Sequence, residues 1–360
     1  MKSIKFIISG GGTGGHIYPA LAIATGIKEN YKNSKILFVG ALGKMEMDRI
    51  PREGFPIIGL WISGFKRSVS FSNLLFPLKL IVSLIHSLLI ILRFRPQIVI
   101  GTGGFASGPL LQIATWLNYP TLIQEQNSYP GITNRILSKK VDRICVAFDN
   151  MEKFFPKQKI RITGNPVRDY LINLKPSKIS KGFFDLDSNK KTLAVIGGSL
   201  GSKRINDLIK SELEYIMSFG IQIIWQCGSI YYETLKGLNS KAVLIQPYIN
   251  EMKHLYSVAD FVISRAGAGI ISELSCVAKP SLLIPSPNVS ENHQWHNANV
   301  LAKKKAVLLI QEAELDRKFR NLFSQLVLDE KKQTELKKNL KSFALPGATG
   351  KIIDEIKELI

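Results

Sequence analysis

The chain contains two glycine-rich loops about half its length apart, and each follows a short apolar segment. Residues 9–16 read SGGGTGGH after the run 4–8, and residues 197–202 read GGSLGS after the run 192–196. Glycines at a turn from strand to helix permit positive φ and let the helix present its first N–H groups to an anion. Two such turns predict two doubly wound α/β domains with a phosphorylated ligand in the cleft between them.

Length and composition are those of a globular protein with two cores: 360 residues, 45% of them hydrophobic and 21% charged. The net charge of +20 favours an anionic partner, unless the excess lysine only covers solvated faces. No RNA- or DNA-binding motif accompanies the charge, so no nucleic-acid partner is predicted. Three isolated cysteines indicate a reducing compartment, and the N-terminus leads into a strand instead of an export signal. We therefore expect the protein to act in the cytoplasm.

Apolar segments alternate with helical patterns along both halves, which is typical of parallel βαβ units. The pattern in the first half predicts strands at 4–9, 35–40, 97–101, 120–124 and 143–147, and helices at 18–30, 43–53, 74–93, 107–118 and 131–140. In the second half it predicts strands near 192–196, 221–226, 242–246, 260–264, 281–285 and 306–309. The tail 329–360 is predicted to be helical, with a break at the Leu-Pro-Gly of 345–347.

Residues 74–92 form an almost uniformly apolar segment that is long enough for a transmembrane helix. A predicted strand begins directly afterwards, so a span would place the halves of one sheet on opposite sides of a membrane. Polar residues also share one helical face, namely Lys79, Ser83, His86 and Ser87. Two other interpretations stay open. The segment is either a buried helix of the first domain or an exposed apolar patch that enters a bilayer surface, rimmed by Lys66, Arg67, Arg93 and Arg95.

The first loop also satisfies Gly-x-Gly-x-x-Gly, the fingerprint of a nicotinamide dinucleotide site. That fingerprint expects an acidic residue at the end of the second strand to hold the ribose. The predicted strand 35–40 ends without one, and the next carboxylate is Glu46. This absence counts against a dinucleotide. The loop 197–202 also lacks the Gly-Lys-Ser/Thr ending of a nucleotide-hydrolase loop.

Two further segments of the first half follow predicted strands. Residues 101–109, GTGGFASGP, are either a tight turn before a helix with Pro109 at its first position or, together with the first loop, a cradle for a pyrophosphate. Residues 124–131, QEQNSYPG, put polar side chains where an open α/β sheet faces its ligand. The alternative there is a helix cap formed by Asn127 or Ser128.

Single residues also suggest chemistry. Residues 264–273, SRAGAGIISE, form another turn from strand to helix, and Glu273, about one turn into that helix, can accept hydrogen bonds from ribose hydroxyls or favour the helix dipole. His16 can act as a base near neutral pH, or it can donate a hydrogen bond to a phosphate or to a backbone carbonyl. Two patterns imitate metal motifs without completing a ligand set, so no metal site is predicted; they are Asp185-x-Asp187 and the pair His293 and His296.

Taken in order, these motifs resemble those of glycosyltransferase family 28, in particular its members that make lipid II for bacterial peptidoglycan. The resemblance covers essentially the whole chain. The motifs that carry it are residues 10–16 with Pro19, 101–105, 125–127, 164–168, 197–199 and 267–273 with Gln294.

The resemblance implies the GT-B architecture, in which two Rossmann-like, doubly wound parallel-sheet domains face each other across a cleft. An acceptor and membrane-associating domain would comprise 1–164 plus 342–360, and a UDP-sugar domain 165–341. The implied reaction moves N-acetylglucosamine from UDP-N-acetylglucosamine to the C4 hydroxyl of the muramoyl sugar of lipid I, with inversion and without cofactor or metal. The enzyme would be peripheral to an anionic membrane surface, on the cytoplasmic face of the inner membrane. A UDP-N-acetylglucosamine epimerase or a related UDP-sugar:lipid glycosyltransferase is the alternative.

The resemblance also implies roles for single residues. Glu273 would bind ribose, the backbone of Ile249 would meet uracil, and Ser199 would bind phosphate. The other implied donor residues are Thr13, Gly14, Gly15, Asn127, Arg168, Ala268, Gly269, Ile270, Ile271, Ser272 and Gln294. The acceptor's pyrophosphate would meet Gly11, Gly12, Gly103 and Gly104. For the base that takes the proton of the acceptor hydroxyl, our hypothesis is His16, with Glu125 as the alternative.

Overall fold

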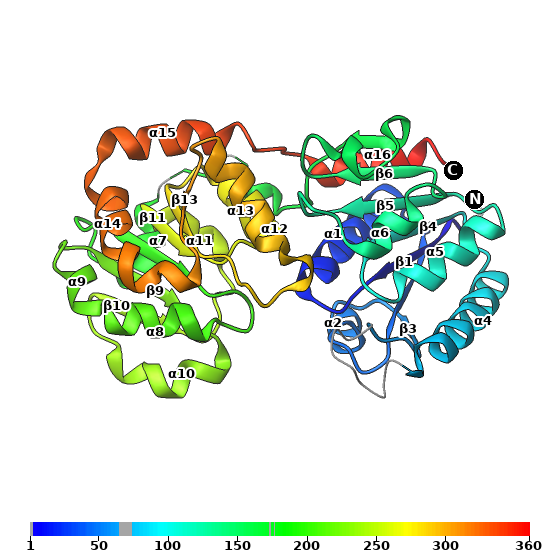
Figure 1. The fold of residues 1–360 in the computed structure, drawn as a ribbon, viewed down its shortest axis with the longest axis horizontal. Coiled ribbons are helices and arrows are strands. Elements are labelled where there is room, and N and C mark those ends of the chain that lie inside the picture. The colour runs from blue at the N-terminus through cyan, green and yellow to red at the C-terminus, as the bar shows by residue number, and fades with distance from the viewer. Residues whose placement is uncertain (1–2, 65–73, 173, 176) are drawn as a thin grey trace. The chain divides into compact units, whose positions relative to one another are not determined.

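The computed structural model describes residues 3–64, 74–172, 174–175 and 177–360, and the chain divides into two compact units (Figure 1). The first unit comprises Met1–Val167 together with Gly347–Ile360, and the second comprises Arg168–Pro346. Each unit is built around its own parallel sheet and its own hydrophobic core. The predicted fold class, two parallel-sheet α/β domains, is confirmed.

The first unit contains a seven-stranded sheet in the order β3-β2-β1-β4-β5-β6-β7, in which every pairing is parallel. Its strands are β1 (Lys5–Gly10), β2 (Lys35–Ala41), β3 (Ile57–Leu60), β4 (Ile98–Gly103), β5 (Thr121–Glu125), β6 (Arg143–Val146) and β7 (Ile160–Ile162). The chain runs outward in both directions from the adjacent pair β1 and β4. Open α/β sheets bind ligands at such a switch point, beyond the carboxyl ends of the strands.

Helices cover this sheet, and their bounds are α1 (Gly14–Asn30), α2 (Glu46–Arg52), α4 (Phe76–Phe94), α5 (Ser107–Trp116), α6 (Ile132–Leu137) and α16 (Ala348–Lys357). α1 begins at Gly14 and not at 18, because the loop glycines form its first turn. Pro109 is the third residue of α5, not the first as expected. The last helix, α16, packs against α1 and is tied to β6 by an ion pair of Arg143 with Glu355 (3.0 Å). The last helix therefore belongs to the first unit, together with Met1–Val167.

The second unit contains a six-stranded parallel sheet in the order β10-β9-β8-β11-β12-β13. Its strands are β8 (Thr192–Ile196), β9 (Gln222–Gln226), β10 (Val243–Gln246), β11 (Phe261–Ser264), β12 (Ser281–Leu283) and β13 (Leu308–Leu309). Its switch point lies between β8 and β11. The helices are α7 (Lys178–Phe183), α8 (Lys203–Ser211), α9 (Leu213–Met217), α10 (Ser229–Leu235), α11 (Met252–Val258), α12 (Ala268–Val277), α13 (His293–Lys303), α14 (Leu315–Leu328) and α15 (Glu330–Lys341).

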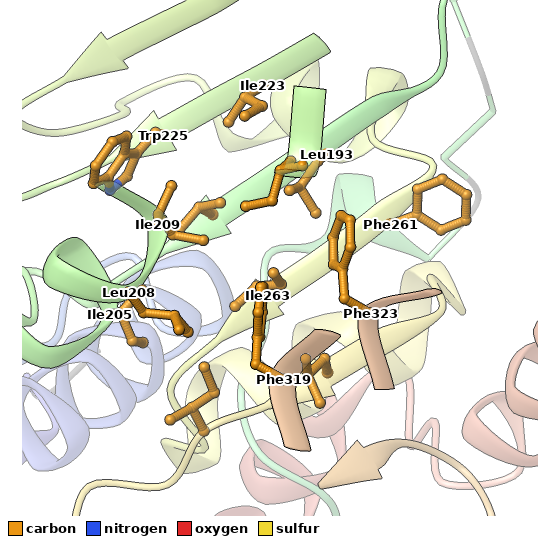
Figure 2. Close-up of a cluster of buried hydrophobic side chains, with 14 of the residues drawn as sticks. Leu193, Ile205, Leu208, Ile209, Ile223, Trp225, Phe261, Ile263, Phe319 and Phe323 are labelled. Atoms are coloured by element: carbon orange, nitrogen blue, oxygen red, sulfur yellow. The ribbon is translucent and has the colours of Figure 1, made fainter. Parts of the chain in front are cut away.

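One core cluster of the second unit lies between its sheet and the helices α8 and α14 (Figure 2). Leu193 of β8 and Ile263 of β11 are completely buried there, beside the stacked rings of Phe319 and Phe323 from α14. Strands that are covered on both faces read as continuous apolar runs, which is why the sequence predicted them well. This core holds the carboxyl ends of β8 and β11, and the loops that follow them, in fixed positions.

Helix α4 is long and apolar enough to cross a membrane, yet it packs against α5 and β3 within the first unit. The interpretation of this segment as a buried helix is wrong, because only Ser83, Ser87, Ile90 and Ile91 are buried. The two serines face inward with Ile90 and Ile91, and most of the other large apolar side chains face outward. The exposed apolar side chains of the helix are Leu78, Ile81, Val82, Ile85, Leu89 and Leu92. Of the cations expected at the rim, Arg93 and Arg95 are exposed, whereas Lys66 and Arg67 lie outside the described residues.

Candidate functional site

The carboxyl edge of the first unit's sheet carries the loop between β1 and α1. The N–H of Gly11 donates to the carbonyl of Gly103 (3.2 Å), and the N–H of Gly12 donates to Oε2 of Glu46 (2.8 Å). Helix α1 has no capping side chain and no acidic residue in its first turn, so its first N–H groups, beginning at Gly14, can bind an anion. Of the groups predicted to bind phosphate, the start of the helix is therefore better placed than the N–H groups of Gly11 and Gly12.

Glu46 is a site residue that the sequence reasoning missed. Its carboxylate is 1% exposed and accepts hydrogen bonds from the N–H groups of Gly12 (2.8 Å) and Ala41 (3.0 Å). It thereby ties α2 to both the first glycine loop and the end of β2. In the sequence, Glu46 stands out only as a possible ribose-binding carboxylate, and it lies too far beyond the end of β2 for that role. A signal was present nonetheless, because a glycine loop with many N–H groups needs a nearby buried acceptor.

The imidazole of His16 is held by the same loop, with Nδ1 2.8 Å from the carbonyl oxygen of Gly11. A carbonyl oxygen only accepts, so Nδ1 carries the proton and Nε2 keeps its lone pair. Burial lowers the pKa of His16, against the opposing effects of the hydrogen bond to Gly11 and the charge of Glu46. The neutral imidazole therefore predominates at pH 7, in the tautomer that leaves Nε2 able to accept a proton.

The loop after β4 lies directly against the first loop. A side chain at Gly104, where φ is +93°, would put its Cβ 2.4 Å from the carbonyl oxygen of Gly11. The hydroxyl of Thr102 also donates to the carbonyl of His16 (2.8 Å). The four glycines predicted at the acceptor pyrophosphate thus lie together at one edge of the sheet, although the N–H groups of Gly11 and Gly12 already have protein acceptors.

Glu125, at the end of β5, is 1% exposed and has donors on both carboxylate oxygens. Oε1 accepts from the backbone N–H (2.9 Å) and the side-chain amide (3.1 Å) of Asn127, and Oε2 accepts from the N–H of Gly131 (3.2 Å) and the amide of Asn134 (2.8 Å). Burial raises the pKa of Glu125, and these hydrogen bonds oppose the rise. This arrangement favours a structural role over the catalytic alternative. The cap interpretation of Asn127 and Ser128 is wrong, because Gly131 is the N-cap of α6.

Buried amide side chains connect the end of β5 to the end of β4 and to the segment after β7. The amide of Gln124 donates to Oδ1 of Asn165 (2.9 Å), whose own amide donates to the carbonyl of Gln126 (3.0 Å). Gln126 in turn donates to the carbonyl of Thr102 (2.8 Å). These bonds fix the segment that carries Asn127 against the strand that carries Gly103.

In the second unit a pocket of about 700 Å³ opens beside the loop between β8 and α8. The loop has positive φ at Gly198 and Gly201, and the side chain of Ser202 caps α8 by accepting from the N–H of Ile205 (3.3 Å). The three cations of the pocket, Lys203, Arg204 and Arg265, are each paired with a carboxylate, so the backbone N–H groups of the glycine loop are the groups best suited to an anionic ligand. The pocket is lined by residues 197–204, Asp207, Arg265, Ser286, Asn288, Val289, Gln294 and Glu312. Two predicted donor residues, Ser199 and Gln294, are therefore brought together here.

Gln226, at the end of β9, connects this loop to the predicted uracil segment. Its Nε2 donates to the carbonyl of Gly198 (2.9 Å), and its Oε1 accepts from the N–H of Ile249 (3.1 Å). Since the N–H of Ile249 is engaged in this way, the carbonyl is the group that a base can meet without displacing Gln226. Sequence reasoning did not single out Gln226, although a glutamine that ends an apolar strand was a usable signal.

Helix α12 follows β11 and begins at Ala268, without a capping side chain and without an acidic residue in its first turn. Its first-turn N–H groups, at Ala268, Gly269 and Ile270, are therefore an anion site of the same kind as the start of α1. Nearby, Oε1 of Gln294 accepts from the N–H of Ser286 (2.8 Å), which orients its amide nitrogen as a donor.

Glu273 lies beyond the first turn of α12, so the helix-dipole interpretation is wrong. The side chain is 18% exposed, and its Oε1 lies 3.8 Å from the guanidinium of Arg168. Its Oε2 accepts a hydrogen bond from the hydroxyl of Tyr256 (2.9 Å). Burial raises the pKa of Glu273, while Arg168 and Tyr256 act in the opposite direction.

Among the described residues, no group of three or more His, Cys, Asp or Glu side chains is arranged to hold a metal ion. The residues of the two metal-like patterns have local partners instead. Asp187 accepts from the N–H of Asn189 (2.9 Å), and Nδ1 of His293 donates to the carbonyl of Ser290 (2.7 Å).

Comparison with known proteins gives consistent matches over the whole chain. Residues 6–146 match the glycosyltransferase family 28 N-terminal domain, and residues 192–350 match the glycosyltransferase family 28 C-terminal domain. Proteins of Flavobacterium psychrophilum and Christiangramia forsetii are 51% and 50% identical, over 100% of this chain and 99% and 98% of theirs. Both are named UDP-N-acetylglucosamine--N-acetylmuramyl-(pentapeptide) pyrophosphoryl-undecaprenol N-acetylglucosamine transferase.

Solved structures agree with these matches. The crystal structure of Acinetobacter baumannii MurG is similar with a TM-score of 0.78 and 25% identity, over 99% of this chain and 100% of that one. CalG4, the calicheamicin glycosyltransferase, has a TM-score of 0.73 at 12% identity, over 100% of this chain and 98% of its own. A UDP-N-acetylglucosamine 2-epimerase has a TM-score of 0.66 at 14% identity, over 99% of this chain and 96% of its own. The last two likenesses show a common fold only.

Proposed function

This chain belongs to glycosyltransferase family 28, and from that premise we propose that it makes lipid II. It transfers N-acetylglucosamine from UDP-N-acetylglucosamine to the C4 hydroxyl of the muramoyl sugar of lipid I, with inversion at the anomeric carbon. The observation that carries this proposal is the identity of about half of all residues, over full length, with relatives named for that transfer. The epimerase alternative has support from the fold alone.

The donor is proposed to bind mainly to the second unit. Glu273 holds the ribose, the carbonyl of Ile249 meets the uracil, and the start of α12 binds the diphosphate. Support comes from the pocket beside the β8–α8 loop, which contains Ser199 and Gln294, and from the uncapped N-terminus of α12. The remaining donor residues stay those implied by the family motifs: Thr13, Gly14, Gly15, Asn127 and Arg168.

The chemical step is a displacement at the anomeric carbon. The C4 oxygen of the acceptor forms a bond to that carbon as the bond to UDP breaks, and Nε2 of His16 takes the hydroxyl proton. The leaving diphosphate gains negative charge, which the N–H groups at the start of α12 and the cation of Arg168 stabilise. The glycines gathered around Gly11 and Gly103 face the pyrophosphate of the acceptor.

The function is tested by measuring UDP release from UDP-N-acetylglucosamine in EDTA, with and without a lipid I analogue. We expect release only when the acceptor is present, together with a disaccharide product and with no loss of rate in the chelator. Release without acceptor would instead indicate an epimerase or a hydrolase, and acceptor-dependent release that stops in EDTA would contradict metal independence.

We also propose that the enzyme is peripheral to the membrane, on its cytoplasmic face, with the outward face of α4 entering the lipid. Ile81 and Ile85 are more than half exposed on this helix, and Trp116 of the neighbouring α5 is 61% exposed. Figure 1 shows α4 and α5 side by side at the outer side of the unit. Two exposed cations, Arg93 and Arg95, stand at the C-terminal end of α4. An apolar face with flanking cations is suited to anionic lipid.

Replacing both Ile81 and Ile85 with glutamate is expected to weaken binding to phosphatidylglycerol vesicles by about 10-fold or more. The reason is that each isoleucine side chain would pass from water into the lipid on binding, and glutamate would not. Vesicle co-sedimentation measures the change. The control replaces Ile179 and Ile230, two isoleucines that are even more exposed in the second unit, with glutamate, and it should leave binding unchanged. Equal effects of both pairs would mean that α4 is not the membrane face.

A further inference from the structure

The carboxylate of Glu273 is supported from behind by a tyrosine that is completely buried. Tyr256 lies in α11 with 0% of its surface exposed, and its hydroxyl donates to Oε2 of Glu273 at 2.9 Å. A buried phenol usually has a hydrogen-bond partner, and here that partner is a residue of the proposed donor site. The family motifs that implied donor residues do not include Tyr256.

The geometry divides the two oxygens of Glu273 between different partners. Tyr256 is bound to Oε2, whereas Oε1 has Arg168 at 3.8 Å, too far for a good hydrogen bond. A carboxylate oxygen can accept two hydrogen bonds, so both oxygens can still receive ribose hydroxyls while Tyr256 stays in place. A rigid ring has few rotamers, and its hydroxyl therefore limits the rotation of the more flexible glutamate.

The hydroxyl of Tyr256 also affects the ionisation of Glu273. Burial raises the pKa of Glu273, which favours the neutral acid, and Arg168 and the hydrogen bond donated by Tyr256 both oppose that rise. Charge-assisted hydrogen bonds are stronger than neutral ones, so an ionised and oriented Glu273 is the better ligand for two hydroxyl groups.

We propose that Tyr256 is a positioning residue that holds Glu273 for the ribose and thereby sets the preference of this site for ribonucleotides over deoxyribonucleotides. The inference rests on the proposed function in one respect, the assignment of Glu273 to the ribose. It adds that recognition of the sugar depends on a side chain that does not touch the nucleotide.

The test is isothermal calorimetry of the full-length protein with UDP and with 2′-deoxy-UDP. Wild type should bind UDP about 10- to 100-fold more tightly than 2′-deoxy-UDP, because the missing hydroxyl removes a hydrogen bond to a charged group. Tyr256→Phe keeps the buried ring and removes only the hydroxyl. We expect this substitution to weaken the binding of UDP about 5- to 20-fold and the binding of 2′-deoxy-UDP less than about 3-fold. The preference for UDP over 2′-deoxy-UDP therefore becomes smaller.

Two further variants separate positioning from general destabilisation. Tyr215→Phe deletes a hydroxyl that donates to the carbonyl of Arg320 (3.1 Å) in the same unit, and it should leave the preference unchanged. In a Glu273→Ala background, Tyr256→Phe should have no further effect on the preference, since the two residues act as one. Thermal denaturation checks that each variant is folded.

Three results would contradict the positioning role of Tyr256. Equal weakening of both nucleotides by Tyr256→Phe, or no weakening, overturns the positioning role while leaving the ribose assignment intact. If Glu273→Ala binds UDP as tightly as wild type does, the ribose assignment in the proposed function fails, and the role of Tyr256 fails with it. A preference that still falls with Tyr256→Phe in the Glu273→Ala background would show that Tyr256 does not act through Glu273.

Discussion

His16→Ala is expected to lower kcat by about 10²- to 10⁴-fold, the usual contribution of a general base, while UDP binding changes little. The reason is the tautomer: with Nδ1 donating to the carbonyl of Gly11, Nε2 is left to take the acceptor proton. Turnover at saturating substrates, measured with a water-soluble acceptor, gives kcat without any effect of membrane binding.

The pH dependence of the wild-type enzyme follows from the same geometry. The base must be neutral to accept a proton, and burial lowers the pKa of His16 below its ordinary value of 6.5. Activity should therefore be flat near pH 7 and fall as the pH drops through a value below 6.5. In His16→Ala this acidic limb should disappear.

A second variant distinguishes the base from a structural hydrogen bond. The amide nitrogen of asparagine can replace Nδ1 as the donor to Gly11, but asparagine has no basic nitrogen. We expect His16→Asn to be as inactive as His16→Ala. Near-normal turnover in His16→Asn would assign His16 to holding the loop and return the search for a base to other residues.

Glu125→Ala is expected to destabilise the first unit by about 3 kcal/mol, because four donors lose a buried acceptor at once. In a domain of this size that corresponds to a fall of about 6–12 °C in the Tm. Thermal denaturation followed by circular dichroism measures it, with the two units allowed separate transitions.

The control for Glu125 is Glu152→Ala, which removes an exposed carboxylate from the same unit and should change stability by less than about 0.5 kcal/mol. A Glu125→Ala protein with wild-type stability and a kcat reduced as far as in His16→Ala would favour the catalytic alternative. The expected result is the reverse, a clear loss of stability with turnover of the folded fraction reduced less than in His16→Ala.

The strands of both sheets were predictable wherever they are buried on both faces. β1, β4 and β8 are continuous apolar runs, because a parallel sheet covered by helices needs no polar face. The sequence failed to predict β3 and β7, which are short edge strands with partly exposed residues. An edge strand pairs on one side only, so its residues carry a weaker pattern of hydrophobicity than those of a central strand.

The site was predictable where backbone conformation requires glycine, and unpredictable where a buried polar side chain supports a loop. The loops around Gly11 and Gly103 could be identified because few other residues allow those turns. Tyr256 could not, because it acts through a partner that only the folded chain brings near, and the signals at Glu46 and Gln226 did not show which groups these side chains bind. The composition of helix α4 likewise fitted a buried core helix as well as an exposed apolar one. Only the packing of the folded chain determined that its serines face inward.

The sequence by itself determined the two parallel-sheet domains, the position of the glycine loops after their first strands and membership of a glycosyltransferase family. These features depend on local rules, namely hydrophobic periodicity and the backbone freedom of glycine. Only the tertiary structure decided which N–H groups remain available to an anion, which nitrogen of His16 is basic and which carboxylates are already occupied. Hydrogen bonds and burial set these properties, and both arise from contacts between residues far apart in the chain.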